Sequence, residues 1–158
     1  MTKQRLQTMV IDASVARSAG STDHHRSRDC REFLQWLLRH CHRLAISADI
    51  EKEWKKHQSN FTLKWRVAME QRGKVQNLGP IDCGRLKNRI QALDLQKPSQ
   101  QRLMQKDALL VVAAQATDRV IVSLDNAARD LFAEHAKQLR TPRGLRWRNP
   151  AEEAIPWI

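Results

Sequence analysis

Short apolar runs alternate along the chain with longer segments in which apolar residues recur every three or four positions. The apolar runs have strand length and occupy residues 6–11 (LQTMVI), 43–47 (RLAIS) and 119–124 (RVIVSL). Helical spacing predicts helices over 28–42, 48–57, 60–73, 85–95, a segment from near Ser99 or Lys106 to about 118, and 125–139. Strands that alternate with helices in this way predict an α/β fold, with a mainly parallel central sheet flanked by helices.

Polar segments separate these elements. Residues 18–27 and 77–84 are predicted to be connections because they gather glycine, proline, serine and aspartate. Ser47 is placed to cap the helix that follows it. The chain of 158 residues is expected to form one domain, 1–158, with a core at about 6–138 and a tail, 139–158, that adds an edge strand near Leu145–Arg148.

The charge balance narrows the choice of partner. Lys and Arg number 28 against 17 Asp and Glu, for a net charge of +11. Such an excess favours a polyanion, and we expect nucleic acid rather than a membrane because no basic amphipathic helix with an aromatic insertion face is evident. The N-terminus lacks the apolar segment of a signal peptide, and residues 108–116 are too few to span a bilayer. The three cysteines form no CxxC pair, so we expect reduced thiols and a cytoplasmic protein.

Two of the predicted strands end on an aspartate. Asp12 follows the first strand and Asp125 follows the strand at 119–124. Because the carboxyl ends of parallel strands meet at one edge of a sheet, both carboxylates are expected there, where open α/β sheets bind ligands. Asp107 is predicted to open a buried helix, where the helix dipole alone would stabilise it by about 0.3–1 kcal/mol. Capping could explain any one of the three, but together they predict an acidic cluster.

Four segments resemble the PIN-domain ribonucleases, in particular toxins of the VapC type. They are MVIDASV (9–15), ISADIEKEW (46–54), KDALLVVAAQATD (106–118) and VIVSLDNAARDLF (120–132). Their order and separation are similar to those of the family over about residues 8–135. The resemblance implies a PIN-like three-layer fold and a metal-dependent endoribonuclease that uses Mg²⁺ or Mn²⁺.

The resemblance also implies the site residues. Asp12, Asp107 and Asp125 fall on the family's acidic positions, as catalytic residues and metal ligands. Ser14 matches a small polar residue that hydrogen-bonds near the metal. Crowded carboxylates repel one another, and a divalent cation bound by their hard oxygen atoms would supply the missing charge.

A glutamate on the predicted helix 48–57 completes the implied set. With Ile50 and Trp54 on the inward face, Glu51 and Glu53 lie about equally far round the helix, so periodicity does not decide between them. The family's motif places its acid just before the bulky residue, which favours Glu53 as the fourth catalytic residue.

One position departs from the family's pattern. Many relatives carry a second acid two residues after the one that matches Asp125, and this chain has Ala127 there. Asn126 and Asp130 are the candidate substitutes. The departure puts a second metal ion in doubt, and it leaves open whether catalysis is retained.

Basic side chains bracket the acidic positions along the chain and are candidates for binding phosphates of RNA: Lys55, Lys56, Lys64, Arg66, Arg85, Lys87 and Lys106. The candidate partners are RNA, an antitoxin protein and a second copy of the chain. The rival interpretation is a non-catalytic nucleic-acid-binding or protein-interaction module on the same fold. A phosphotransfer receiver is a third interpretation, and it would require a pair of acids before the first strand. It ranks last because residues 1–7 hold no acid.

Overall fold

A central sheet of five parallel strands organises the chain in a computed structural model, which describes residues 5–141 and 144–154. The spatial order of the strands is β3-β2-β1-β4-β5, and every neighbouring pair is parallel. The strands are β1 (Thr8–Ile11), β2 (Arg43–Ile46), β3 (Val75–Asn77), β4 (Val120–Val122) and β5 (Arg146–Arg148).

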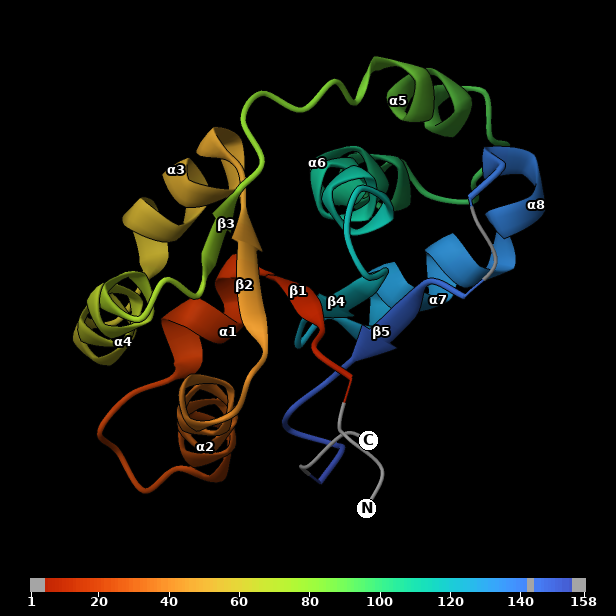
Figure 1. Ribbon diagram of the computed structural model, residues 1–158. Coiled ribbons are helices and arrows are strands. Elements are labelled where there is room, and N and C mark those ends of the chain that lie inside the picture. The colour runs from red at the N-terminus through yellow and green to blue at the C-terminus, as the bar shows by residue number, and fades with distance from the viewer. Residues whose placement is uncertain (1–4, 142–143, 155–158) are drawn as a thin grey trace.

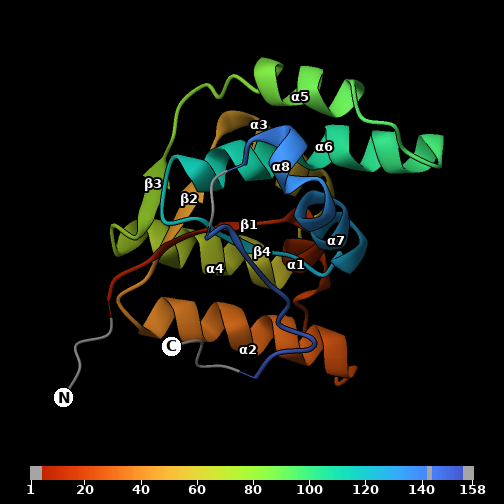
Figure 2. The same ribbon diagram turned by 90° about the vertical axis from the view of Figure 1, so that its right-hand side faces the viewer.

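Helices cover both faces of this sheet. They are α1 (Ala13–Ser18), α2 (His25–Arg39), α3 (Ala48–His57), α4 (Asn60–Gln71), α5 (Gly84–Gln91), α6 (Pro98–Gln115), α7 (Asn126–Glu134) and α8 (Ala136–Leu139). Figures 1 and 2 show α1 to α4 on one face of the sheet and α5 to α8 on the other. The predicted α/β fold with layers of helices around a parallel sheet is therefore confirmed.

Two inner strands of the sheet, β1 and β4, are buried along their whole length. All four residues of β1 and all three of β4 are buried, as expected for central strands with helices on both faces. The ladder between β1 and β4 continues one residue past β1, because the Asp12 amide donates to the Val122 carbonyl at 2.8 Å. Asp12 thus leaves the sheet at a fixed position.

Several predicted elements match the observed ones. Ser47 caps α3 by accepting a hydrogen bond from the Ile50 amide at 3.2 Å. The predicted edge strand in the tail is β5, which pairs with β4. Two elements were missed: α1, which begins directly after Asp12, and β3, a three-residue strand with little apolar content between the helix predicted to end near Gly73 and the connection predicted at 77–84.

The prediction that Asp107 opens a helix is wrong. Of the two starting points considered, the one near Ser99 is close to the observed start at Pro98, and Lys106 lies well inside α6. Proline is favoured in the first turn of a helix because its missing N–H is unpaired there anyway. The Gln100 side chain also accepts a hydrogen bond from the Lys97 amide at 3.3 Å. Asp107 therefore lies beyond the first turns of α6, without help from the N-terminal end of the dipole.

No helix among residues 5–141 and 144–154 is long and apolar enough to cross a membrane. The three cysteines are free thiols.

Candidate functional site

Asp12 does not use its side chain to cap the helix it precedes. It is the N-cap residue of α1, yet its carboxylate accepts no capping hydrogen bond. Instead, Asp12 Oδ2 accepts a hydrogen bond from the hydroxyl of Ser123 at 3.2 Å, which joins the ends of the neighbouring strands β1 and β4. The carboxylate is thus held at the carboxyl edge of the sheet and pointed toward the end of the neighbouring strand.

Asp125 lies at the same edge and is tied to Asp12 through one serine. The Asp125 amide donates to Ser123 Oγ at 3.0 Å, while Asp125 Oδ1 accepts from the Ala128 amide at 3.0 Å and caps α7. Ser123 is buried. Sequence reasoning missed its role, although a hydroxyl near the end of an apolar strand, two residues before an acid, was an available signal.

Asp107 reaches this edge from α6, and its carboxylate is the most buried of the three. Its exposed fraction is 4%, and the side chain forms no hydrogen bond or ion pair with the part of the chain that is described. Burial, and after it the negative charges of Asp12 and Asp125, raise the pKa of Asp107 from an ordinary value of 3.8 to about 7, although the neighbouring Lys106 acts in the opposite direction. Asp107 is therefore close enough to Asp12 and Asp125 for their charges to act on its carboxylate.

Glu53 shares a small cavity with two of the aspartates. The cavity holds about 30 Å³ and is lined by Asp12, Glu53 and Asp107, together with apolar side chains and Lys106. This is room for one water molecule or one cation, and too little for a nucleotide. Trp54, the next residue after Glu53, donates from Nε1 to the Ile11 carbonyl at 2.9 Å and so fixes α3 against the end of β1.

Glu51 lies on a different side of α3. Its carboxylate accepts from Arg66 at 3.2 Å, and Arg66 also contacts Glu70 at 3.0 Å. It does not line the cavity that Glu53 shares with the aspartates. The geometry places Glu53, and not Glu51, with the aspartates, although Glu53 also contacts Lys56 at 3.4 Å.

The additional candidate residues make hydrogen bonds or ion pairs with other parts of the protein. Ser14 accepts from the Leu124 amide at 3.2 Å and joins α1 to the turn after β4. The Asn126 side chain bonds Glu152 and accepts from Asn149 at 3.1 Å. Asp130 is exposed and pairs with Arg129 at 3.0 Å. Neither Asn126 nor Asp130 lines the cavity.

The predicted phosphate-binding residues divide into two groups. Six are exposed: Lys55, Lys56, Lys64, Arg85, Lys87 and Lys106. Arg66 is buried and ion-paired to two glutamates, so its guanidinium is engaged inside the protein. Sequence reasoning missed Arg17 and Arg26, which line a hollow of about 370 Å³ together with Ser14, Asp125 and Asn126.

The side-chain atoms at this edge are of the type that binds a hard divalent cation. They are carboxylate oxygens, and the buried carboxylate of Asp107 lacks any other counter-charge among the described residues apart from the neighbouring Lys106. Within 5–141 and 144–154, however, no three His, Cys, Asp or Glu side chains are arranged to hold one ion. The carboxylates would have to draw together around a cation.

Comparison with known proteins adds nothing to this geometry. No model of a known protein family matches the chain, and no curated protein matches it. The likeness to PIN-domain ribonucleases therefore depends on the four sequence segments alone.

Proposed function

We propose that the chain is a metal-dependent endoribonuclease whose active site is the carboxyl edge of the sheet. One observation carries the proposal: the buried carboxylate of Asp107 has no hydrogen bond or ion pair within 5–141 and 144–154, and it lies beside a cation-sized cavity that Asp12 and Glu53 also line. A buried carboxylate that no hydrogen bond satisfies, and that only the charge of the exposed Lys106 opposes, destabilises a fold, and such groups are found most often at functional sites. A structural role would be served better by Asn or Leu at this position.

The side chains divide the work between holding a cation and holding RNA. Asp12, Glu53 and Asp107 would hold Mg²⁺ or Mn²⁺, with Asp125 completing the set. When bound, the cation would lower the pKa of a water molecule and stabilise charge on the scissile phosphate. Ser123 orients Asp12 through its hydroxyl and Asp125 through the Asp125 amide.

Basic side chains beside the acids would bind the flanking phosphates. Arg17 and Arg26 line the hollow next to Asp125, and Lys106 lines the cavity of Asp107. Together with the net charge of +11 they favour a polyanionic substrate. A role as the toxin of a toxin–antitoxin pair belongs to the same proposal, with an antitoxin protein as the partner.

Cleavage of a labelled single-stranded RNA tests the proposal. The purified protein should cut it with Mg²⁺ or Mn²⁺ and not with EDTA, and Asp12→Asn should lower the rate by more than about a hundredfold. Asp130→Asn is the control, because Asp130 is exposed and does not line the cavity.

Equal cleavage by wild type and Asp12→Asn would contradict the proposal. If wild type binds RNA without cutting it under any metal condition, the chain is the non-catalytic module instead. The ion pair of Glu53 with Lys56 and the alanine at position 127 favour that second function.

A further inference from the structure

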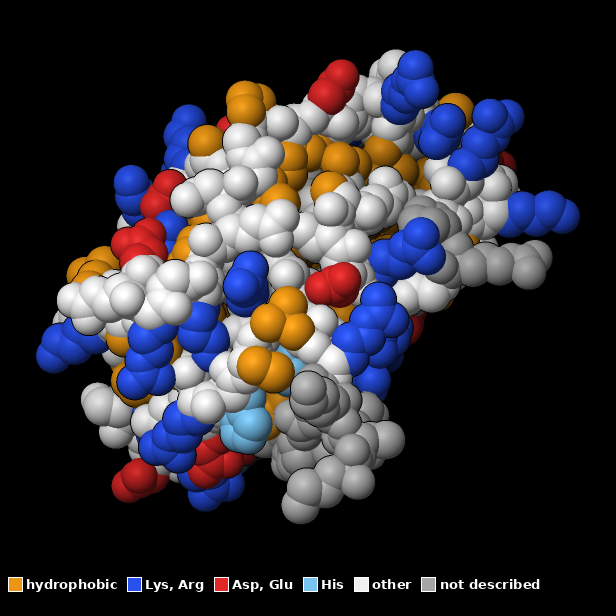
Figure 3. All heavy atoms as spheres, viewed as in Figure 1, with side chains coloured by type: hydrophobic (Ala, Val, Ile, Leu, Met, Phe, Trp, Pro, Cys, Tyr) orange, Lys and Arg blue, Asp and Glu red, His pale blue; other side chains and the backbone are white. Residues whose placement is uncertain are grey.

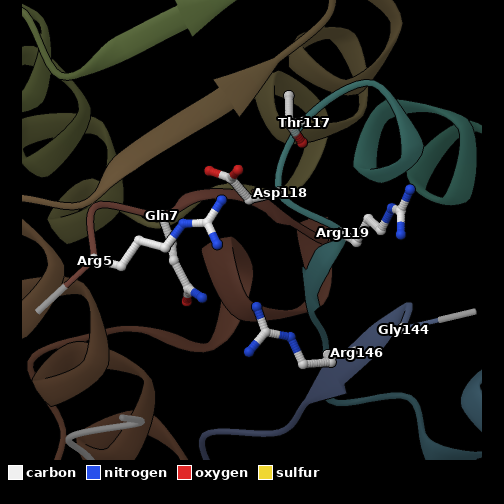
Figure 4. A pocket seen from close by; sticks show the side chains of 7 residues that line it. All are labelled: Arg5, Gln7, Thr117, Asp118, Arg119, Gly144 and Arg146. Carbon is white, nitrogen blue, oxygen red and sulfur yellow. The ribbon is translucent and has the colours of Figure 1, made fainter.

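A second charged hollow lies at the opposite edge of the sheet. It measures about 480 Å³ and lies where β1, β4 and β5 begin, lined by Arg5, Gln7, Thr117, Asp118, Arg119, Gly144 and Arg146. Figure 4 shows the side chains of Arg5, Gln7 and Arg146 turned toward the middle of the hollow, whereas Arg119 extends to the other side. This volume is within the usual range for small-molecule sites. We refer to it as the arginine pocket.

Hydrogen bonds fix the backbone around the arginine pocket. Asp118 Oδ2 accepts from the Thr8 amide at 2.6 Å, which ties the turn before β4 to the start of β1. The Arg146 amide donates to the Arg119 carbonyl at 2.8 Å, so the two arginines are held by adjacent strands. The positions from which their side chains project are therefore set by the sheet itself.

The charge in the arginine pocket is unbalanced. Among the described lining residues, Arg5 and Arg146 lie with one acid, Asp118, and an oxygen of that acid already accepts a backbone hydrogen bond. Figure 3 shows further Lys and Arg side chains on this face of the molecule. Like charges that converge without an equal number of acids favour an anionic ligand.

The lining also indicates which kind of anion fits. Guanidinium groups match phosphate oxygens in pairs, and the amide of Gln7 can add a further donor. Among the residues that the structure describes, none that lines the pocket has an aromatic or large aliphatic side chain. A nucleobase would therefore have nothing to stack on, and a protein segment would lack the apolar anchors that carry most interfaces.

We propose that the arginine pocket binds phosphate groups, with Arg5 and Arg146 as the two principal contacts. Neighbouring phosphates on one ligand, either a free pyrophosphate group or successive phosphates of an RNA strand, provide this chemistry. The proposal is independent of the nuclease proposal, since the arginine pocket and the acidic cluster lie at opposite ends of the strands.

Calorimetric titration with pyrophosphate in the presence of EDTA tests the proposal, because no metal-bridged contact at the acidic edge then contributes. Arg5→Gln and Arg146→Gln should each weaken binding by about tenfold or more, as expected for the loss of a charge-assisted hydrogen bond. Arg28→Gln is the matched control: it removes the same charge from an exposed residue that does not line the pocket, and it should change affinity by less than about twofold. Thermal melting should show that all three variants fold.

A short oligouridylate titrated under the same conditions distinguishes the two sources of phosphate. If RNA competes with pyrophosphate and is weakened by the same two substitutions, the ligand is the RNA backbone. If only pyrophosphate binds in this way, the ligand is a free phosphate compound. The proposal fails if neither probe binds saturably, or if Arg28→Gln weakens binding as much as Arg146→Gln.

Arg119→Gly sharpens the assignment. Arg119 has a positive φ of 65°, a conformation in which glycine is less strained than arginine. The glycine variant should melt no lower than Arg146→Gln, and its loss of affinity should be smaller because Arg119 points to the side of the pocket. A loss larger than that of Arg146→Gln would overturn the choice of Arg5 and Arg146 as principal contacts.

Discussion

The two edges of one short sheet carry opposite charge in different settings. The acidic side chains at the carboxyl edge are fixed by strand ends and by α6, and one of them is almost fully buried. The arginines at the amino edge are exposed. With strands of three or four residues, the edges are only about 10–13 Å apart. Exposed charges cost a fold little, whereas a buried unpaired carboxylate costs several kcal/mol. The acidic edge is therefore the stronger functional signal.

The largest effect expected from this difference concerns the pH dependence of stability without metal. The pKa of Asp107 is raised to about 7 by burial and by two neighbouring acids. Between these two pKa values the folded protein keeps a proton that the unfolded chain has released. The contribution of Asp107 to the free energy of unfolding is therefore fully present below its ordinary pKa of 3.8 and is lost as pH rises through about 7. The loss should approach about 4 kcal/mol.

Denaturant unfolding in EDTA at a series of pH values measures this contribution. Asp107→Asn should match wild type in stability near pH 4 and exceed it increasingly toward pH 8. Asp130→Asn, at an exposed position, should follow wild type throughout. Parallel curves for Asp107→Asn and wild type would mean that the carboxylate is not destabilised by its surroundings.

A smaller effect separates the two glutamates of α3. Glu53→Gln should weaken Mn²⁺ binding and raise the metal concentration needed for cleavage by about tenfold, because Glu53 lines the cavity with Asp12 and Asp107. Glu51→Gln should leave both unchanged and lower the free energy of unfolding by about 1 kcal/mol or less through its contact with Arg66. Metal titration and denaturant unfolding of both variants provide the measurements. The reverse assignment would show that the family's motif was transferred wrongly at this helix.

Much of the fold could be predicted from the sequence because its central elements have strong local patterns. The runs that became β1, β2 and β4 are apolar and end in polar residues, so their type and order were readable. β3 could not be predicted in the same way, since only Val75 is apolar and the strand forms by pairing with β2. The start of α6 was left open because its first turns are polar and carry little periodic signal.

The residues of the candidate site likewise differ in how far the sequence alone could place them. Asp12 and Asp125 could be placed together because parallel strands share a carboxyl edge. Asp107 was expected at this edge for two reasons: it was predicted to open a buried helix, and the resemblance implies it. The first reason was wrong, since Asp107 lies inside α6. The choice between Glu51 and Glu53 depends on Trp54 anchoring α3 beneath β1, and this contact between distant segments has no local sequence signal.

Calorimetric titration of Mn²⁺ into the protein at pH 8 tests the central claim most directly, because at that pH Asp107 is mostly deprotonated and available as a ligand. Wild type and Glu51→Gln should bind Mn²⁺ saturably, and Asp12→Asn should bind it with an affinity reduced by more than about a hundredfold. Absence of saturable binding to wild type, or equal affinity in Asp12→Asn, would contradict the claim that the acidic edge of the sheet binds a divalent cation.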